Sequence, residues 1–163
     1  MIAFMFWNIG KKSILDRVAR IANRHKADIL VLAECEAEPA AVVAALNQSP
    51  GARWEYPTEI TPSKLKVFSH LVPGSRAFFN PMWRFMTDSP GKPSGTYHFR
   101  VAKPINHFWY TLDQVLVRPD LADKLVSVDI IDTDGIQSLV TPSGWPDAEN
   151  ASDHLPILAV LDV

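Results

Sequence analysis

The sequence predicts one domain of layered α/β architecture, and three observations support this prediction. Residues 2–7 and 28–33 are nearly continuous apolar runs, which is typical of strands buried on both faces of a sheet. Each run is followed by a segment with helical character, and the order strand, helix, strand, helix implies helices layered on a sheet. With 163 residues, of which 47% are hydrophobic, the chain is long enough to bury a core of its own.

The two helices are predicted from their apolar spacing and their ends. The first starts near Ser13, which forms a Ser-x-x-Asp capping box with Asp16. The second begins at about Pro39, a favoured first-turn residue, and runs through Leu46 until Ser-Pro-Gly at residues 49–51 stops it. The apolar stripe of the first helix comprises Ile14, Leu15, Val18, Ile21 and Ala22.

The second half of the chain is predicted to return to strands after a long irregular region. Residues 51–105 are rich in proline, so we expect little regular structure there beyond a short strand at 64–71 and a helical turn at 80–86. No repeat or linker is visible, and one domain over residues 1–163 is predicted. Three further strands are predicted at residues 107–117, 125–131 and 155–163.

Composition argues against several classes of protein. Sixteen Lys and Arg against eighteen Asp and Glu give a net charge of −2, which attracts no nucleic acid to the surface as a whole but leaves room for a local basic groove. One cysteine, Cys35, excludes an internal disulfide framework and a Cys-rich zinc site, and it favours a reducing, cytoplasmic location. No apolar run approaches the ~20 residues of a membrane helix. Residues 1–7 lack the basic start of a signal peptide and are expected to be a strand.

Polar side chains stand at the ends of four apolar segments. They are Asn8, Glu34, Asp113 and the pair Asp153 and His154. Strand ends are where α/β folds build sites, and this set of oxygen and nitrogen ligands suits a hard cation such as Mg²⁺. Each residue alone is also typical of a turn or a helix cap, so the hypothesis depends on their joint placement.

These residues lie in four blocks that resemble the endonuclease/exonuclease/phosphatase superfamily, the DNase I-like phosphoesterases that require Mg²⁺. The blocks follow one another in the family's order: Phe-Trp-Asn-Ile at 6–9, the strand ending in Glu at 27–34, Leu-Asp-Gln-Val-Leu-Val at 112–117 and Ser-Asp-His-Leu-Pro at 152–156. The resemblance implies an α/β (α+β) fold, a DNase I-like two-sheet β-sandwich flanked by helices. It also implies hydrolysis of a phosphodiester, above all in nucleic acid, with Mg²⁺ or Mn²⁺ as the cofactor.

The resemblance further implies a role for each residue. Asn8, Glu34 and Asp153 match positions that hold the metal, and Asn8 also contacts the substrate. His154 matches the histidine that stabilises charge on the scissile phosphate, and Asp113 matches the carboxylate that orients it. Asp153, His154 and Asp113 are therefore the expected catalytic residues. A carboxylate bonded to an imidazole favours the charged ring and fixes its direction, which suits this role.

Two motifs of the family have no clear counterpart in this sequence. One is a strand ending in a histidine, which Ser-His-Leu around His70 resembles only vaguely. The other is a Gly-Asp-x-Asn segment whose Asp activates water; at residues 77–80 Phe78 stands where this Asp would be, and Phe cannot accept a proton. A central block is therefore predicted to be missing, with its junction near residues 71–75, so that the fold is internally shortened.

Residues 76–110 interleave basic and aromatic side chains, a pattern that suits nucleic-acid binding. Tyr97, Arg100 and Trp109 are the candidate substrate-binding residues there, although packing of loops onto a sheet explains the same pattern. Two alternatives to an active enzyme remain open. The chain is a catalytically impaired family remnant that binds nucleic acid or a protein, or associates with itself through exposed sheet edges. Otherwise it is an unrelated small α/β protein whose polar strand ends are only caps and turns.

Overall fold

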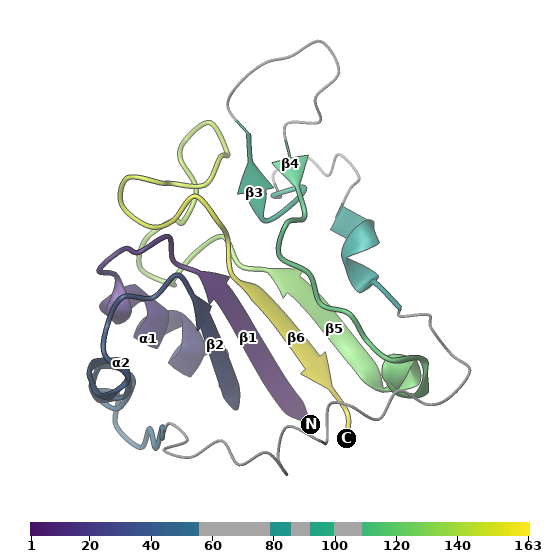
Figure 1. Ribbon diagram of the computed structural model, residues 1–163, viewed down its shortest axis with the longest axis horizontal. Coiled ribbons are helices and arrows are strands. Elements are labelled where there is room, and N and C mark those ends of the chain that lie inside the picture. The colour runs from purple at the N-terminus through teal and green to yellow at the C-terminus, as the bar shows by residue number, and fades with distance from the viewer. Residues whose placement is uncertain (56–78, 86–91, 100–108) are drawn as a thin grey trace.

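A computed structural model describes residues 1–55, 79–85, 92–99 and 109–163 (Figure 1). The mixed α/β class is confirmed, because the described residues form two sheets and a few helices. The main sheet has the strand order β2-β1-β6-β5; β1 is parallel to β2, and β6 is antiparallel to both β1 and β5. Its strands are β1 (Ile2–Asn8), β2 (Ile29–Ala33), β5 (Leu125–Ile130) and β6 (Ile157–Leu161).

A small second sheet lies beyond the end of the main sheet at which β1 finishes (Figure 1). It pairs β3 (Tyr97–His98) with β4 (Trp109–Tyr110). The helices of the described part are α1 (Leu15–Arg24), α2 (Pro39–Leu46) and the 3₁₀ helices η2 (Pro81–Phe85) and η3 (Pro119–Lys124). None of them is long and apolar enough to cross a membrane.

Successive side chains of a strand point to opposite faces of the sheet, so the main sheet has a part of the core on each face. Met5 and Trp7 of β1 face α1 and are almost completely buried with its Val18 and Ile21. On the opposite face a smaller cluster joins Met82 of η2 to a set of β5 and β6 side chains: Val128, Ile157 and Ala159. The sheet is therefore packed on both faces at β6 and mainly on one face at β2.

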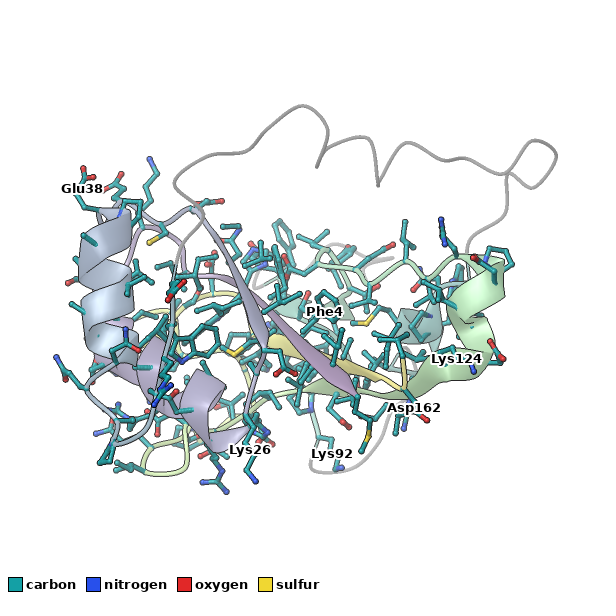
Figure 2. All side chains as sticks on the ribbon, turned by 90° about the horizontal axis from the view of Figure 1, so that it is seen from below. Phe4, Lys26, Glu38, Lys92, Lys124 and Asp162 are labelled. Atoms are coloured by element: carbon teal, nitrogen blue, oxygen red, sulfur yellow. The ribbon has the colours of Figure 1, made fainter. Side chains whose placement is uncertain are left out.

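The prediction that the first two strands are buried on both faces is wrong for part of the sheet. Phe4 is 37% exposed, Ile29 40% and Val31 49%, all on the face opposite α1. In Figure 2, Phe4 is labelled near the middle of the sheet, while α1 and α2 lie to one side. In the described part of the chain the second layer covers β5, β6 and only some of β1, because it consists of η2 and residues 114–121. A groove of about 590 Å³ lies between that layer and Phe4.

Several element predictions are confirmed, and two are wrong. The second helix spans Pro39–Leu46 as predicted, and the helical turn after residue 80 is η2. The capping box at Ser13 does not form, because α1 begins at Leu15, with Ile14 at its N-cap and no side-chain cap. The predicted strand at 107–117 is not continuous over its described part, residues 109–117: after β4 the backbone leaves the sheet and pairs again at Val117, with Phe79. The predicted strand at 64–71 and junction at 71–75 lie outside the described residues.

A buried ion pair fastens the long connection between β5 and β6 to α1. Arg17 is 4% exposed and donates to Asp134 Oδ2 at 2.9 Å, to the Asn150 carbonyl at 2.8 Å and to the Ser138 carbonyl at 2.9 Å. Burial alone would raise the pKa of the Asp134 carboxyl, but backbone N–H groups and two arginines, Arg17 and Arg20, hold that pKa well below its usual range. The anchor matters for function because the same connection leads into the predicted site residues at 153 and 154.

Replacing Arg17 with methionine is expected to lower the free energy of unfolding by about 3 kcal/mol, because the variant leaves a buried carboxylate short of a partner. Urea denaturation measures the change. The matched control is Arg118→Met, which breaks the exposed pair with Asp120 and should alter stability by less than about 1 kcal/mol. Equal losses in the two variants would contradict the anchoring role of Arg17.

Candidate active site

Two of the predicted metal ligands meet because β1 and β2 are parallel and in register. Asn8 pairs with Ala33 at the carboxyl ends of the two strands, and Glu34 is the next residue. The Asn8 side chain donates from Nδ2 to Glu34 Oε1 at 3.0 Å and accepts the backbone N–H of Gly10 at Oδ1, also at 3.0 Å. The amide is therefore held in one orientation, with its oxygen toward the turn and its nitrogen toward the carboxylate.

The turns that follow the two strands use left-handed backbone. Gly10, Lys11 and Glu34 have φ values of 54°, 61° and 50°. For Lys11 and Glu34 this conformation costs about 1–2 kcal/mol each, since neither is glycine. The Lys11 N–H donates to the Glu34 carbonyl at 2.8 Å, which locks the two turns together. Such strain is common where a site requires a particular side-chain direction, and here it bends both strands away just beyond Asn8 and Glu34.

A third segment brings Asp153 and His154 to the same edge of the sheet. Ser152 is completely buried, and its hydroxyl donates to the Asn8 carbonyl at 2.7 Å while accepting the His154 N–H at 3.1 Å. A Cβ at Gly10 would lie 3.2 Å from Asp153 Oδ1, so the glycine leaves room for that carboxylate. Asp153 and Glu34 are both exposed to solvent. The two carboxylates thus flank the end of β1.

Asp113 and His154 form a close pair, as the resemblance implies. The distance from His154 Nδ1 to Asp113 Oδ2 is 2.7 Å, and the two side chains are only 13% and 8% exposed. A carboxylate is an acceptor, so Nδ1 carries the proton in this pair. Burial lowers the pKa of His154, but the hydrogen bond and charge of Asp113, with the charges of Asp153 and Glu34, outweigh it and raise that pKa above its ordinary value. The site therefore favours an imidazolium.

The three candidate substrate-binding residues at 97, 100 and 109 are placed differently. Tyr97 lies beside His154, with ring centroids 4.9 Å apart and backbones joined in an antiparallel bridge. Trp109 projects from the other side of the small sheet, where it meets His98 edge-on at 5.2 Å and packs against the main core. Packing accounts for its position, and its role in binding stays a prediction. Arg100 lies outside the described residues.

Two residues that build this site could not be predicted from the sequence. Gly10 gave no signal beyond an ordinary turn, although its missing side chain admits Asp153. Thr96 is completely buried and bonded to the backbone of Asp113, but it stands in a proline-rich region where no periodic pattern marks it. Both act through contacts with residues far away in the sequence, which a local pattern does not reveal.

The donor set at the end of β1 fits a hard divalent cation. Glu34 and Asp153 supply carboxylate oxygens, whereas Asn8 turns its amide nitrogen toward Glu34 and its oxygen toward Gly10, so Asn8 orients the Glu34 carboxylate. Mg²⁺ binds through one or two carboxylates and keeps several waters, which agrees with two exposed carboxylates. No cluster of three or more His, Cys, Asp or Glu side chains able to hold a metal occurs in the described part, so a cation here would depend on water for much of its coordination.

Comparison with known proteins finds no matching family model, no matching curated protein and no matching solved structure. The resemblance to the DNase I-like phosphoesterases therefore depends on the four sequence blocks. Because a fold by itself does not determine function, the chemistry depends on the geometry of the site.

Replacing Asp113 with asparagine is expected to lower the pKa of His154, because the variant keeps the size of the side chain and removes the charge that favours the imidazolium. An NMR pH titration of the ring protons measures it. Since the folded pKa is raised, the pair stabilises the fold at pH values below the unfolded pKa, and this contribution disappears as pH rises through the folded pKa. The control is Asp120→Asn, which lies in an exposed pair with Arg118. An unchanged His154 pKa in the Asp113 variant would contradict the assignment.

Proposed function

We propose that this protein is a Mg²⁺-dependent phosphodiesterase of DNase I-like fold that acts on nucleic acid. The observation that carries the proposal is the meeting of two carboxylates and a carboxylate-bonded imidazole at one edge of the sheet. Glu34 and Asp153 present carboxylates beside Asn8, and His154 stands next to them with its Nδ1 bonded to Asp113 at 2.7 Å. Carboxylates hold a divalent cation, and an imidazolium binds a phosphoryl oxygen. The carboxylates and His154 together therefore suit a metal-bound phosphate.

The chain's own residues supply orientation and charge for this reaction. Glu34 and Asp153 would hold Mg²⁺, with Asn8 orienting the Glu34 carboxylate, and the cation would supply charge neutralisation at the phosphate. His154 donates a hydrogen bond from Nε2 to a non-bridging oxygen of the phosphate, where negative charge grows as water attacks. Asp113 keeps that ring protonated and correctly turned. The attacking water forms the new bond to phosphorus as the ester oxygen leaves, and Asp153 is the carboxylate at the site that can accept the water's proton.

A second candidate function is binding without hydrolysis. It is favoured by the sequence, which has no Gly-Asp-x-Asn segment to supply the family's water-activating Asp. The same carboxylates and imidazolium would then hold a phosphate of nucleic acid and leave it intact. In an active enzyme, Asp153 would have to serve as both metal ligand and general base. In a binding module, it would need to serve only as a ligand.

Purified protein is expected to hydrolyse at least one member of a panel of single- and double-stranded DNA, RNA and a chromogenic phosphodiester, in the presence of Mg²⁺ or Mn²⁺. The double variant Glu34→Gln, Asp153→Asn should abolish the metal-dependent turnover. His154→Gln should lower kcat by about 10²–10³-fold, since it removes a donor to the growing charge. Asp162→Asn, a change at an exposed carboxylate beyond the opposite end of β6, is the matched control.

The outcomes separate the candidates. Folded protein that binds a labelled oligonucleotide without turnover, and loses binding on His154→Gln, supports the binding module. Turnover that survives the double variant would refute the proposed site altogether.

A further inference from the structure

The Asp113–His154 hydrogen bond requires other residues that hold the two backbone segments in place. The two residues are 41 positions apart, and each comes from a segment outside regular secondary structure. The backbone around Asp113 runs along the surface, with Leu112 58% exposed and Gln114 also exposed. A 2.7 Å contact between two such segments implies that something buried fixes their relative position.

Thr96 is bonded to both segments at once. Its hydroxyl Oγ1 accepts the backbone N–H of Asp113 at 3.3 Å, and its carbonyl accepts the N–H of Leu155, the residue after His154, at 2.8 Å. Its own N–H donates to the Tyr110 carbonyl at 2.9 Å. Thr96 is 0% exposed, so water does not compete for these bonds.

The residues on either side of Thr96 enforce this placement. A Cβ on Gly95 would lie 2.6 Å from the Tyr110 carbonyl oxygen, so only glycine allows the backbone to approach that strand so closely. Tyr97 pairs with Tyr110 on one side and bridges His154 on the other, and its ring lies 4.9 Å from the imidazole. The segment from Gly95 to Tyr97 therefore lies between the segments that carry Asp113 and His154 and contacts both.

We propose that Thr96 is a positioning residue whose hydroxyl sets the geometry of the Asp113–His154 hydrogen bond. Only the hydroxyl reaches Asp113, whereas the two backbone bonds of Thr96 remain whatever its side chain is. Valine has nearly the same shape and would fill the buried space, but it leaves the Asp113 N–H without its acceptor. The catalytic part of this proposal rests on the proposed function, while the structural part does not.

The test compares Thr96→Val with Thr96→Ser. In the resting protein, the low-field proton signal of the carboxylate-bonded His154 Nδ1–H should be present in wild type and in Thr96→Ser. It should be lost or broadened in Thr96→Val, as in Asp113→Asn. The matched control is Thr133→Val, whose hydroxyl is bonded within its own turn to Gly135 and Gln137. A signal that is unchanged in Thr96→Val would overturn the proposal.

Two further readouts separate this proposal from its alternatives. If the protein hydrolyses a phosphodiester, Thr96→Val should lower kcat by about 10-fold or more with little change in KM, and Thr96→Ser should restore it. A fall in kcat that Thr96→Ser fails to restore would count against the hydroxyl. Hydrogen exchange of the Asp113 amide in wild type needs neither substrate nor variant, so it serves even if Thr96→Val does not fold. Slow exchange supports the bond to Thr96, and exchange as fast as in an open loop refutes it.

Discussion

The register of β1 with its two neighbours is the constraint on which the site depends. In the parallel pair Asn8 lies opposite Ala33, and in the antiparallel pair Phe6 lies opposite Ile157. These pairings bring the end of β2 and the start of β6 to the point where β1 finishes. A slip of one residue would turn Met5 and Trp7 out of the main core, so burial fixes the register strongly. Glu34 and the Ser152–His154 segment are placed by packing that has nothing to do with their chemistry.

Charge is distributed around that edge in two opposed groups. The carboxylates of Glu34 and Asp153 are exposed to solvent, whereas Asp113 raises the pKa of the half-buried His154 imidazole and so favours its cationic form. The two groups also support one another, since the carboxylates raise the pKa of the ring. Binding of a divalent cation would neutralise part of that influence and leave Asp113, through its direct hydrogen bond, as the main support of the imidazolium. This is why the geometry of that single contact matters so much to the proposed reaction.

Much of the local structure was predictable from sequence, and so was the proximity of several candidate site residues. Apolar runs mark the strands of the main sheet, and Pro39 marks the start of α2. Asn8 ends β1 and Glu34 follows β2, so strand-end reasoning brings these two together, whereas Asp113 and the pair Asp153 and His154 lie in irregular segments. Local patterns failed at Ser13, since α1 begins at Leu15 without a side-chain cap, and at residues 109–117, where the chain leaves the sheet near Thr96. The partly open face around Phe4 and Val31 was also unexpected, because an apolar run does not reveal how much of its second face is covered.

The most direct test of the central claim is Mn²⁺ titration followed by NMR in the absence of any substrate. We expect paramagnetic broadening first at the Asn8 side-chain amide, at Gly10 and at the His154 ring, since these groups surround the two carboxylates. Asp153→Asn should remove this effect. Broadening that begins at other acidic surfaces and spares Asn8, or that is the same in the Asp153 variant, would contradict the account, because the strand ends would then not form a cation site.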